Sequence, residues 1–213
     1  MKNAPRNILG IGAHFDDLEL GCGGTLSKHV DAGDRVTMLV VTDSEYRSPK
    51  GVMVRSGETA RQEGLKAAAI IGGDLVCLEC KTFEVMFDEH LTSRISALIQ
   101  EREIDTIYSH WINDLHRDHQ LAGRAALMAG RHVPRFLQYR SNYYSSGVEF
   151  VSRVYSDISS TMDRKIDSIR AHESELERVY NKWIDFVTDQ NRSLGLQIGC
   201  EYAEIFEVVR YLL

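Results

Sequence analysis

Strand-like and helix-like segments alternate along the first two thirds of the chain, and this order constrains the fold more than any other feature of the sequence. The run "RVTMLVVT" at 35–42 is rich in β-branched residues and predicts a buried strand. The run "ETARQEGLKAAAII" at 58–71 predicts a helix that ends at two glycines. Similar patterns predict strands at 7–13, 75–78 and 104–109, and helices at 17–32, 90–103 and 118–129. This alternation indicates an α/β fold with a mostly parallel sheet and helices on both faces.

The pattern changes after Pro134. The stretches "RFLQYRSNYYS" and "VEFVSRVYSDIS" predict one or two extra edge strands in the C-terminal third, antiparallel to their neighbours. A charged segment at 162–183 predicts one long, exposed helix, and the closing "CEYAEIFEVVRYLL" fits either a last strand or a short helix. No linker or internal repeat divides the sequence, so we expect residues 1–213 to form a single domain.

The composition argues against several classes of protein. The formal net charge of −6 argues against a nucleic-acid-binding surface. No apolar run reaches the roughly 18 residues of a membrane span, and the N-terminal "MKNAPRNILG" lacks the apolar stretch of a signal peptide. We therefore expect a cytoplasmic protein, and self-association stays open. Four cysteines make no disulfide framework, and we interpret Cys77 and Cys80 of "CLEC" as half-buried thiols rather than a redox or zinc pair.

Two clusters of metal-ligating and proton-carrying side chains follow two of the predicted strands. The first is "GAHFDD" at 12–17, and the second is "HWINDLHRDH" at 110–119. One histidine near a strand end is usually structural, and an Asp-Asp pair is usually a helix N-cap. In an open α/β sheet, however, ligands bind outside the carboxyl ends of the strands. The two clusters together therefore predict one shared site.

The spacing suggests a role for each member of this site. His14 and Asp17 are three residues apart at a strand-to-helix turn, and His119 would complete two imidazoles and one carboxylate for a catalytic zinc ion with an open position. Asp16 is then a candidate general base, and His116 is a candidate acid or oxyanion stabiliser. Asp118 could accept a hydrogen bond from an imidazole N–H, and its neighbour in the cluster, Asp114, is a candidate substrate contact.

Three glycines of "GCGG" lie inside the helix expected at 17–32. Gly21, Gly23 and Gly24 each cost about 1 kcal/mol there relative to alanine. We interpret them as points of close backbone packing beneath the site. They do not form a dinucleotide-binding fingerprint, because position 15 is a phenylalanine where that motif needs glycine.

These residues carry a resemblance to a known family. "AHFDDLELGCGGTL" resembles the A-H-P-D-D-x-E-x-G-C-G-G-T-L signature of the LmbE-like family, also called the PIG-L deacetylases. "HRDHQLAGRAA" resembles the family's second motif, and "ETARQEGLKAAAIIG", "DRKIDSIRAHESE" and "IGCEYAEIF" are similar to weaker ones. The resemblance implies a Rossmann-like fold and zinc-dependent N-deacetylation, typically of N-acetylglucosamine-type sugars and their conjugates.

By position, the resemblance implies the roles that the spacing suggests: metal ligands His14, Asp17 and His119, general base Asp16, and oxyanion or leaving-group residue His116 supported by Asp118. It also makes Arg61 the best substrate-binding candidate among the cations of the segment 43–63, because Arg61 matches an arginine of the family's helix motif. Three positions depart from the family pattern, namely Phe15, Arg117 and Glu175. None of them removes a ligand or the base.

The leading hypothesis is a zinc-dependent hydrolase that removes an N-acyl group, most simply acetyl, from an amino sugar or its conjugate, which could be nucleotide-linked. A deformylase or another amidase of the same family is an alternative. Two histidines and one carboxylate also suit ferrous iron in an oxygenase, although that chemistry has no evident use for Asp16. A non-catalytic metal- or sugar-binding module is the remaining alternative.

Overall fold

The computed structural model describes residues 4–142 and 144–213. The strands of its main sheet are β1 (Asn7–Gly12), β2 (Arg35–Thr42), β5 (Asp74–Cys80), β6 (Thr106–His110), β7 (Arg135–Tyr139), β8 (Val154–Asp157) and β9 (Ala203–Tyr211). A small hairpin is formed by β3 (Tyr46–Arg47) and β4 (Met53–Arg55). The helices are α1 (Asp17–Ala32), α2 (Gly57–Ile71), α3 (Glu89–Glu101), α4 (Arg117–Ala129), α5 (Met162–Arg170), α6 (Glu173–Arg178) and α7 (Lys182–Ile198).

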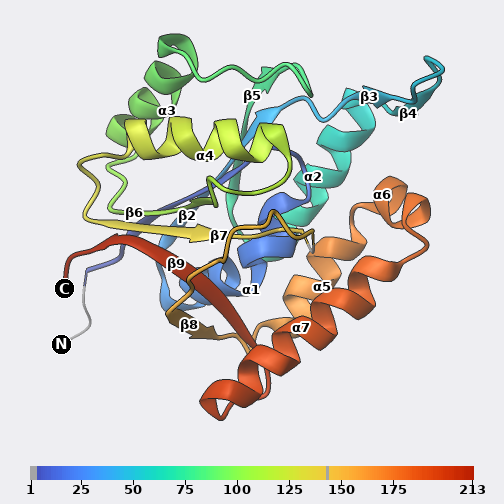
Figure 1. Cartoon of the computed structure of the whole chain (residues 1–213). Helices are drawn as coiled ribbons and strands as arrows, with labels where there is room; N and C mark the ends of the chain where they lie inside the picture. Colours follow the sequence, from blue (N-terminus) through green and yellow to red (C-terminus); the bar gives the residue numbers. More distant parts are fainter. Residues whose placement is uncertain (1–3, 143) are drawn as a thin grey trace.

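The main sheet has the order β5-β2-β1-β6-β7-β9-β8 (Figure 1). Its first five strands are parallel, and β9 runs antiparallel to both of its neighbours. The prediction of a mostly parallel α/β sheet with added strands from the C-terminal third is therefore confirmed. The strand predicted in "RFLQYRSNYYS" is an exception, because β7 lies inside the sheet and runs parallel to β6. The chain moves from β1 to β2 and β5 on one side, and later returns to β6 on the other side of β1. The sheet thus has a switch point between β1 and β6, where a crevice forms at the carboxyl ends of the strands.

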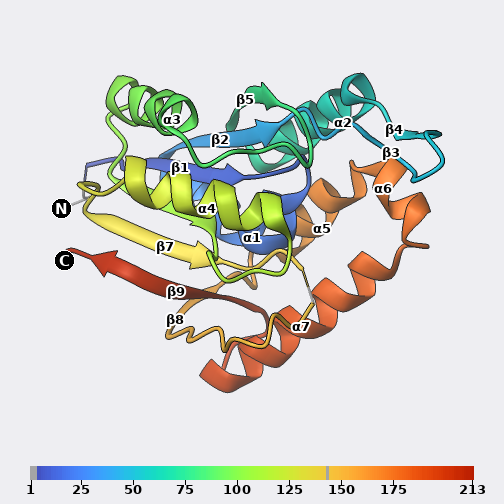
Figure 2. The same cartoon turned by 45° about the horizontal axis from the view of Figure 1, so that its top comes forward.

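Helices cover both faces of the sheet, as Figure 2 shows. On one face, α3 and α4 pack through Leu91, Ile95 and Ala122 against Leu9 and other strand residues. On the opposite face, α1 and α2 bury residues of their own against β1, β2 and β6. The chain fills these layers because its parallel strands are apolar on both faces, as in β2, where seven of eight residues are buried.

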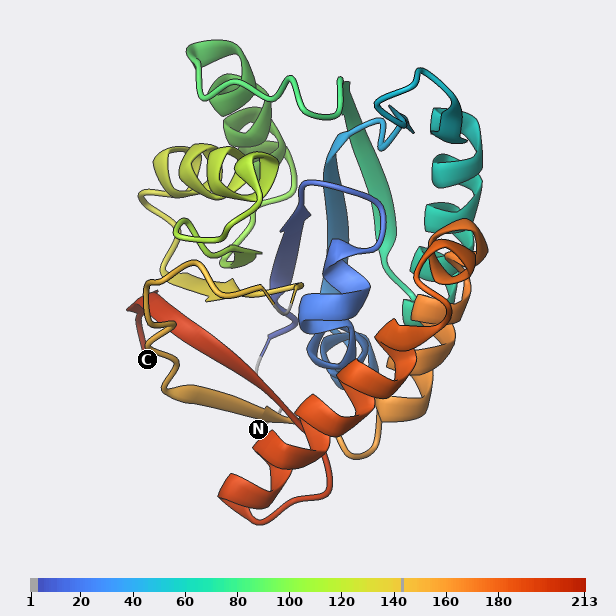
Figure 3. The ribbon, with the colours of Figure 1, turned by 45° about the vertical axis from the view of Figure 1, so that its right-hand side comes forward.

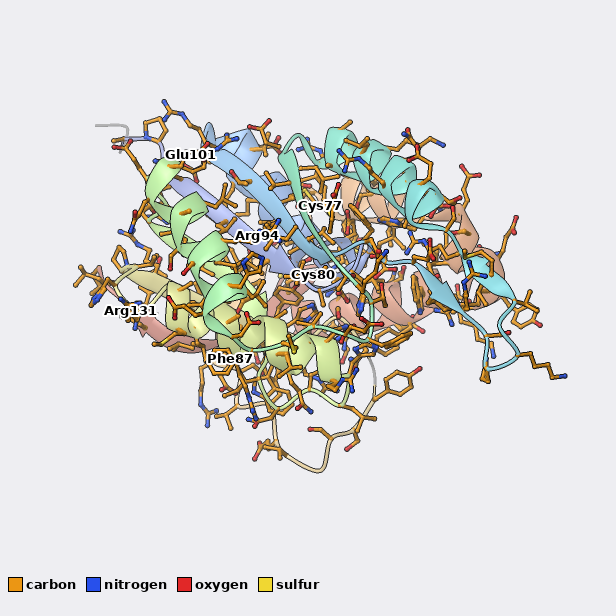
Figure 4. All side chains as sticks on the ribbon, turned by 90° about the horizontal axis from the view of Figure 1, so that it is seen from above. Cys77, Cys80, Phe87, Arg94, Glu101 and Arg131 are labelled. Atoms are coloured by element: carbon orange, nitrogen blue, oxygen red, sulfur yellow. The ribbon has the colours of Figure 1, made fainter. Side chains whose placement is uncertain are left out.

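The two cysteines of "CLEC" lie on β5, where Figure 4 labels both. Cys77 packs with Phe15, Val40 and Ala60 on the α2 face, whereas Cys80 packs into the core under α3 and α4. The two thiols therefore project to opposite faces of the sheet. This arrangement agrees with the interpretation of two separate half-buried thiols.

The segment at 162–183 does not form the single exposed helix that the sequence predicted. It forms α5 and α6, and α7 begins at its end and continues to residue 198. The first break falls at Ala171 and His172, where the buried His172 leaves the helical conformation with ψ at 60°. The second falls at Tyr180 and Asn181, which both have positive φ. Neither break contains a proline or a glycine that would signal it in the sequence. Buried contacts determine where the helix is interrupted.

The α5 and α7 helices are partly buried rather than exposed. Met162, Ile166 and Ile169 of α5 pack against Leu20 of α1 and Val187 of α7. Helix α7 then runs beside β9, as Figure 3 shows. Among the helices of the part that the structure describes, none is long and apolar enough to cross a membrane.

Candidate active site

The two motif clusters meet at the carboxyl ends of β1 and β6. A cavity of about 330 Å³ opens there. Its lining includes His14, Asp16, Asp17, His116 and His119, which come from the β1–α1 turn and from the start of α4. The structure thus brings together the predicted ligands, base and acid at the switch point of the sheet.

Asp17 is the hub of the site. Its carboxylate accepts hydrogen bonds from the His14 backbone N–H (2.7 Å) and from the Ser141 hydroxyl (2.8 Å). The same carboxylate lies 3.0 Å from His110 Nε2 and 3.2 Å from His119 Nε2. Burial raises the pKa of Asp17, but the two histidines outweigh it and hold that pKa well below its usual range. The carboxylate is therefore fixed and ionised.

The separations of Asp17 from His14 and from His119 match those expected around a tetrahedral metal ion. His14 Nδ1 lies 3.3 Å from one oxygen of Asp17, and His119 Nε2 lies 3.2 Å from the other. Ligand atoms about 2.1 Å from a tetrahedral zinc ion are about 3.4 Å apart, which is close to these separations. Among the described residues, two overlapping groups could hold a metal: His14, His116 and His119, or Asp17, His110 and His119.

His119 belongs to both groups. We favour His14 and Asp17 as the residues that would bind a metal ion together with His119. His110 is completely buried, and its ring stacks flat on that of His119 at 4.0 Å. Its Nε2 also lies 3.0 Å from the Ala13 backbone nitrogen, so it faces the β1 backbone rather than the cavity. His116 uses its Nδ1 to accept the backbone N–H of Asp118 at the start of α4.

The protonation of the two candidate ligands His14 and His119 is compatible with a site for a cation. Burial lowers the pKa of His14, but hydrogen bonds to Asp118 and Asp17 raise it to about 10. Burial likewise lowers the pKa of His119, but Asp17 and Asp114 raise it to about 9. Without a metal, the positive charge of the protonated imidazoles neutralises the negative charge of the buried carboxylates. A bound divalent ion would supply this positive charge instead, and the imidazoles would lose their protons.

Asp16 occupies a strained position beside the ligands. Its φ of 130° lies in a region that residues other than glycine rarely adopt. The residue is buried at the cavity wall. Burial and the neighbouring Asp17 raise its pKa to about 7, although Arg55 lowers it. A carboxylate with a pKa near 7 suits general base catalysis at neutral pH.

Arg55 of β4 supports Asp16, and the sequence did not single it out. It is only 3% exposed. Its guanidinium donates to the carbonyl of Phe15 (3.1 Å) and to Glu63 (2.8 Å), and lies 3.4 Å from the Asp16 carboxylate. It also contacts His172 Nδ1 at 3.2 Å. The only sequence signal was a basic residue in a polar segment, which gives no hint of burial.

The structure places the two predicted substrate-binding residues, Arg61 and Asp114, outside the lining of the cavity. Arg61 is half exposed on α2, where it forms an ion pair with Glu79, and it does not line the cavity. Helical periodicity points Arg61 to the solvent. Asp114 is 2% exposed and lies behind His119, 3.4 Å from its Nδ1. Asp114 therefore orients a ligand histidine, so that Nε2 faces the site.

Asp118 contacts an imidazole as the spacing suggested, but this imidazole is that of His14 and not that of His116. Its carboxylate lies 3.1 Å from His14 Nε2 and accepts the backbone N–H of Phe83 at 2.8 Å. It therefore orients the ligand His14, and it supports His116 only through its backbone N–H. The pKa of His116 is lowered to about 4 by burial and by the neighbouring His119 and His14, which favours the neutral imidazole. Because Nδ1 accepts a hydrogen bond, the proton of this neutral ring is on Nε2.

Two of the three glycines of α1 pack closely, as the sequence predicted, and Gly23 does not. A Cβ on Gly21 would lie 2.1 Å from the ring of Tyr139, and one on Gly24 would lie 2.8 Å from Ile158. Tyr139 in turn donates its hydroxyl hydrogen to the Ile11 carbonyl of β1. Close packing beneath the site therefore requires glycine at these two positions. Gly23 has more room, with no atom closer than 3.6 Å to its Cβ position.

Comparison with known proteins now identifies the family. A family model, PIG-L, described as GlcNAc-PI de-N-acetylase, matches residues 9–129, which is more than half of the chain. The chain belongs to the PIG-L family. The matched range holds both motif clusters and all three expected ligands. The resemblance in the sequence is thereby confirmed.

The chain also resembles individual proteins over most of its length. The chain is 26% identical to the diacetylchitobiose deacetylase of Thermococcus kodakarensis, over 95% of this chain and 82% of the relative. The solved N,N'-diacetylchitobiose deacetylase of Pyrococcus horikoshii aligns over 96% of this chain and 84% of its own, with a TM-score of 0.81 and 20% identity. A 4-carboxy-2-hydroxymuconate hydratase from Pseudomonas putida aligns over 98% of both chains, with a TM-score of 0.83 and 17% identity. The fold therefore serves more than one reaction, and the site must decide the function.

Proposed function

We propose that this PIG-L protein is a metal-dependent hydrolase that removes an N-acyl group, most simply acetyl, from an amino sugar or amino-sugar conjugate. The observation that carries the proposal is one cavity in which His14, Asp17 and His119 converge beside Asp16 and His116. The family description and the named deacetylase relatives support the same reaction. We propose Zn²⁺ as the metal, since imidazole and carboxylate ligands with an open position suit it, and Fe²⁺ suits the same donors.

Each residue of the cavity has a separate role in the proposed reaction. His14, Asp17 and His119 would hold a divalent ion, which would supply Lewis acidity to the acyl carbonyl and to the attacking water. Asp16 takes a proton from the attacking water as the new C–O bond forms. His116 donates its Nε2 hydrogen to the carbonyl oxygen as charge develops there. The proton on Asp16 then passes to the nitrogen as the C–N bond breaks, which leaves a carboxylic acid and a free amine. The acid loses its remaining proton to solvent and leaves as a carboxylate.

The positioning contacts explain why these groups are ready to react. Asp118 accepts a hydrogen bond from His14 Nε2, and Asp114 lies 3.4 Å from His119 Nδ1. Such carboxylate partners fix the orientation of a ligand ring. The strained backbone of Asp16 and its contact with Arg55 direct the base toward the cavity. The pKa of about 7 allows Asp16 to be ionised before the attack and protonated after it.

The test uses metal-loaded protein with N-acetylglucosamine, N,N'-diacetylchitobiose and N-formylglucosamine, with free amine as the readout. We expect turnover that a strong chelator abolishes and zinc restores. Asp16→Asn should keep its metal and lose turnover. Asp31→Asn is the matched control, because Asp31 lies at the exposed end of the same helix, paired with Arg164. Full turnover by the metal-free protein or by Asp16→Asn would refute the mechanism. Oxygen consumption with ferrous iron and no free amine would instead favour an oxygenase.

A further inference from the structure

The segment "HESE" at 172–175 packs against a side chain that supports the proposed base. It belongs to "DRKIDSIRAHESE", one of the weaker family motifs, and the proposed reaction gives it no role. It spans the junction of α5 and α6, and both helices pack beside α2 (Figure 1). The side chain that it contacts is Arg55, whose guanidinium lies 3.4 Å from the Asp16 carboxylate. We call His172, Ser174 and Glu175 the Arg55 socket.

Two members of the Arg55 socket contact the guanidinium directly. The Nδ1 atom of His172 lies 3.2 Å from Nη2 of Arg55, and Oε1 of Glu175 lies 4.0 Å from Nη1. None of these three residues is more than 3% exposed. Because the three side chains are buried, water competes little for these contacts, and the groups that face Arg55 determine where its guanidinium lies.

The third member, Ser174, acts through Glu63 of α2. Ser174 donates its backbone N–H and its hydroxyl hydrogen to the Glu63 carboxylate, both at 2.8 Å. Glu63 in turn accepts from Nη2 of Arg55 at 2.8 Å. The Nη2 atom therefore has two fixed partners, Glu63 and His172.

The other terminal nitrogen of the guanidinium, Nη1, supports the base. It donates to the Phe15 carbonyl at 3.1 Å and lies 3.4 Å from the Asp16 carboxylate. The Phe15 carbonyl belongs to the peptide bond that precedes Asp16, whose backbone is strained with a φ of 130°. Arg55 thus contacts both the backbone and the carboxylate of the base. A rotation of the planar guanidinium away from its Nη2 partners would loosen both contacts.

His172 suits this place because its neutral ring adds an acceptor without a negative charge. Asp16, Glu63 and Glu175 already bring three carboxylates within 4.0 Å of the guanidinium. Burial lowers the pKa of His172, but Glu19 raises it above its usual value. The contact with the guanidinium fixes the place of the ring proton, because a guanidinium only donates and Nδ1 must therefore accept. The proton is then on Nε2, which lies 3.5 Å from the Glu19 carboxylate.

We infer that His172 is a positioning residue for the general base: it holds Arg55 in the orientation that keeps Asp16 in place. Ser174 and Glu175 assist it. The inference rests on the proposed function, in which Asp16 is the base. Loss of the Nδ1 acceptor should lower kcat and leave KM nearly unchanged, because a misplaced base weakens the transition state and not the binding of the substrate. A purely structural role would not produce this split.

Two variants of His172 separate the roles of its ring nitrogens. Asparagine places its side-chain oxygen near the position of Nδ1 and can still accept from Arg55. Glutamine places its amide near the position of Nε2 and leaves Arg55 without this acceptor. We expect kcat of His172→Gln to fall about 10- to 100-fold with KM within about threefold of wild type, and kcat of His172→Asn to stay about tenfold higher than that of His172→Gln. His132→Gln is the matched control at an exposed histidine and should leave kcat unchanged.

The assays use the zinc-loaded full chain and whichever of the three amides named above the wild-type protein turns over fastest. Adding His172→Gln to Arg55→Met should lower kcat by less than about threefold further, because His172 acts through Arg55. Urea unfolding of the metal-free protein tests the same pair without turnover. His172→Gln should lower the urea midpoint less in the Arg55→Met background than in the wild-type background.

The possible results separate the inference from the function. Equal kcat values for the two His172 variants, a loss confined to KM, or a loss fully additive with that of Arg55→Met would overturn the inference and leave the deacylase proposal standing. Equal shifts of the urea midpoint in both backgrounds would overturn the inference whether or not the protein is active. A wild-type protein that releases no free amine would refute the proposed function, and the role of His172 in it.

Ser174→Ala is the milder second variant if the His172 variants do not fold. It removes the hydroxyl bond to Glu63 and keeps the backbone bond. We expect kcat to fall about threefold or more at an unchanged KM. A wild-type kcat in this variant would overturn the inference.

Discussion

Replacing Arg55 by methionine should destabilise the protein far more than the same change at Arg61. Breaking a buried ion pair costs about 3–5 kcal/mol, because the partner charge stays buried without compensation. Arg55 has partners in Glu63 at 2.8 Å and Asp16 at 3.4 Å. Glu63 keeps two hydrogen bonds from Ser174, so we expect the lower end of that range, about 3 kcal/mol. The exposed pair of Arg61 and Glu79 should contribute about 0–1 kcal/mol.

Urea unfolding of both variants at pH 7 measures this difference, since a midpoint that shifts without a change in slope reports stability. The two variants make the same chemical change six residues apart, so they differ mainly in burial. Losses within about 1 kcal/mol of each other would refute the reasoning from burial.

The same Arg55 variant should also change the pH profile. Arg55 lowers the pKa of Asp16 against burial and the Asp17 charge. Its removal should raise that pKa, so the acidic limb of kcat/KM moves to higher pH and the base is less ionised at pH 7. Arg55→Lys restores the charge and should return the limb toward its original position. An acidic limb that stays in place in Arg55→Met, or moves to lower pH, would contradict the assignment of Arg55 as a positioning residue for the base.

Three further predictions concern the metal, the oxyanion and the glycines. The pKa values of the two ligand histidines are raised to about 10 and about 9, so zinc binding at pH 7 should release about two protons, as calorimetry in buffers of different ionisation enthalpy would measure. Without metal, the stability that these imidazoles contribute is complete below pH 6.5 and is lost as the pH rises through 9 to 10. His116→Ala should keep its zinc in metal analysis while kcat falls about 100- to 1,000-fold; a zinc-free, folded variant would show that ligand and acid are exchanged. Gly21→Ala should lose about 1–3 kcal/mol through the clash with Tyr139, whereas Gly23→Ala should be neutral or stabilising in thermal unfolding.

The sequence predicted the parallel part of the sheet and the composition of the site because both depend on local patterns. Strand β2 was placed at its observed bounds, and Gly33 ends α1 with a φ of 90°. His14 and His119 each follow the carboxyl end of a predicted parallel strand. This position alone predicted that both lie at the same edge of the sheet. These signals are local because strand periodicity, helix caps and turn glycines act within a few residues.

The parts that the sequence missed depend on contacts between distant segments. Arg55 is a buried cation only because Glu63 and Asp16 surround it. Asp118 approaches His14 across 104 residues, and only the folded chain shows which histidine it supports. The break at His172 likewise follows from a buried contact with Arg55, while the local sequence there is good for a continuous helix.

The C-terminal third contributes to the site through a break in α1. Cys22 has a φ of −147°, so the backbone hydrogen bonds around it cannot follow the helical pattern. In a regular helix, Gly24 N–H would donate to the Leu20 carbonyl. Here Gly24 N–H and Thr25 N–H donate to the Glu204 carboxylate of β9 instead, and Lys165 Nζ of α5 donates to the Leu20 carbonyl.

Lys165 and Glu204 also bond to each other at 2.5 Å, and both side chains are 1% exposed. This pair satisfies the groups that the break leaves free on both sides. A buried ion pair is generally a weak source of stability, but one that fills such a break fixes a conformation. The turn of α1 before the break carries Asp17 and Leu20, which line the cavity. The C-terminal segments therefore set the direction of the first helical turn, which explains why sequence signals of the family extend to "DRKIDSIRAHESE" and "YAEIF", far from the ligands.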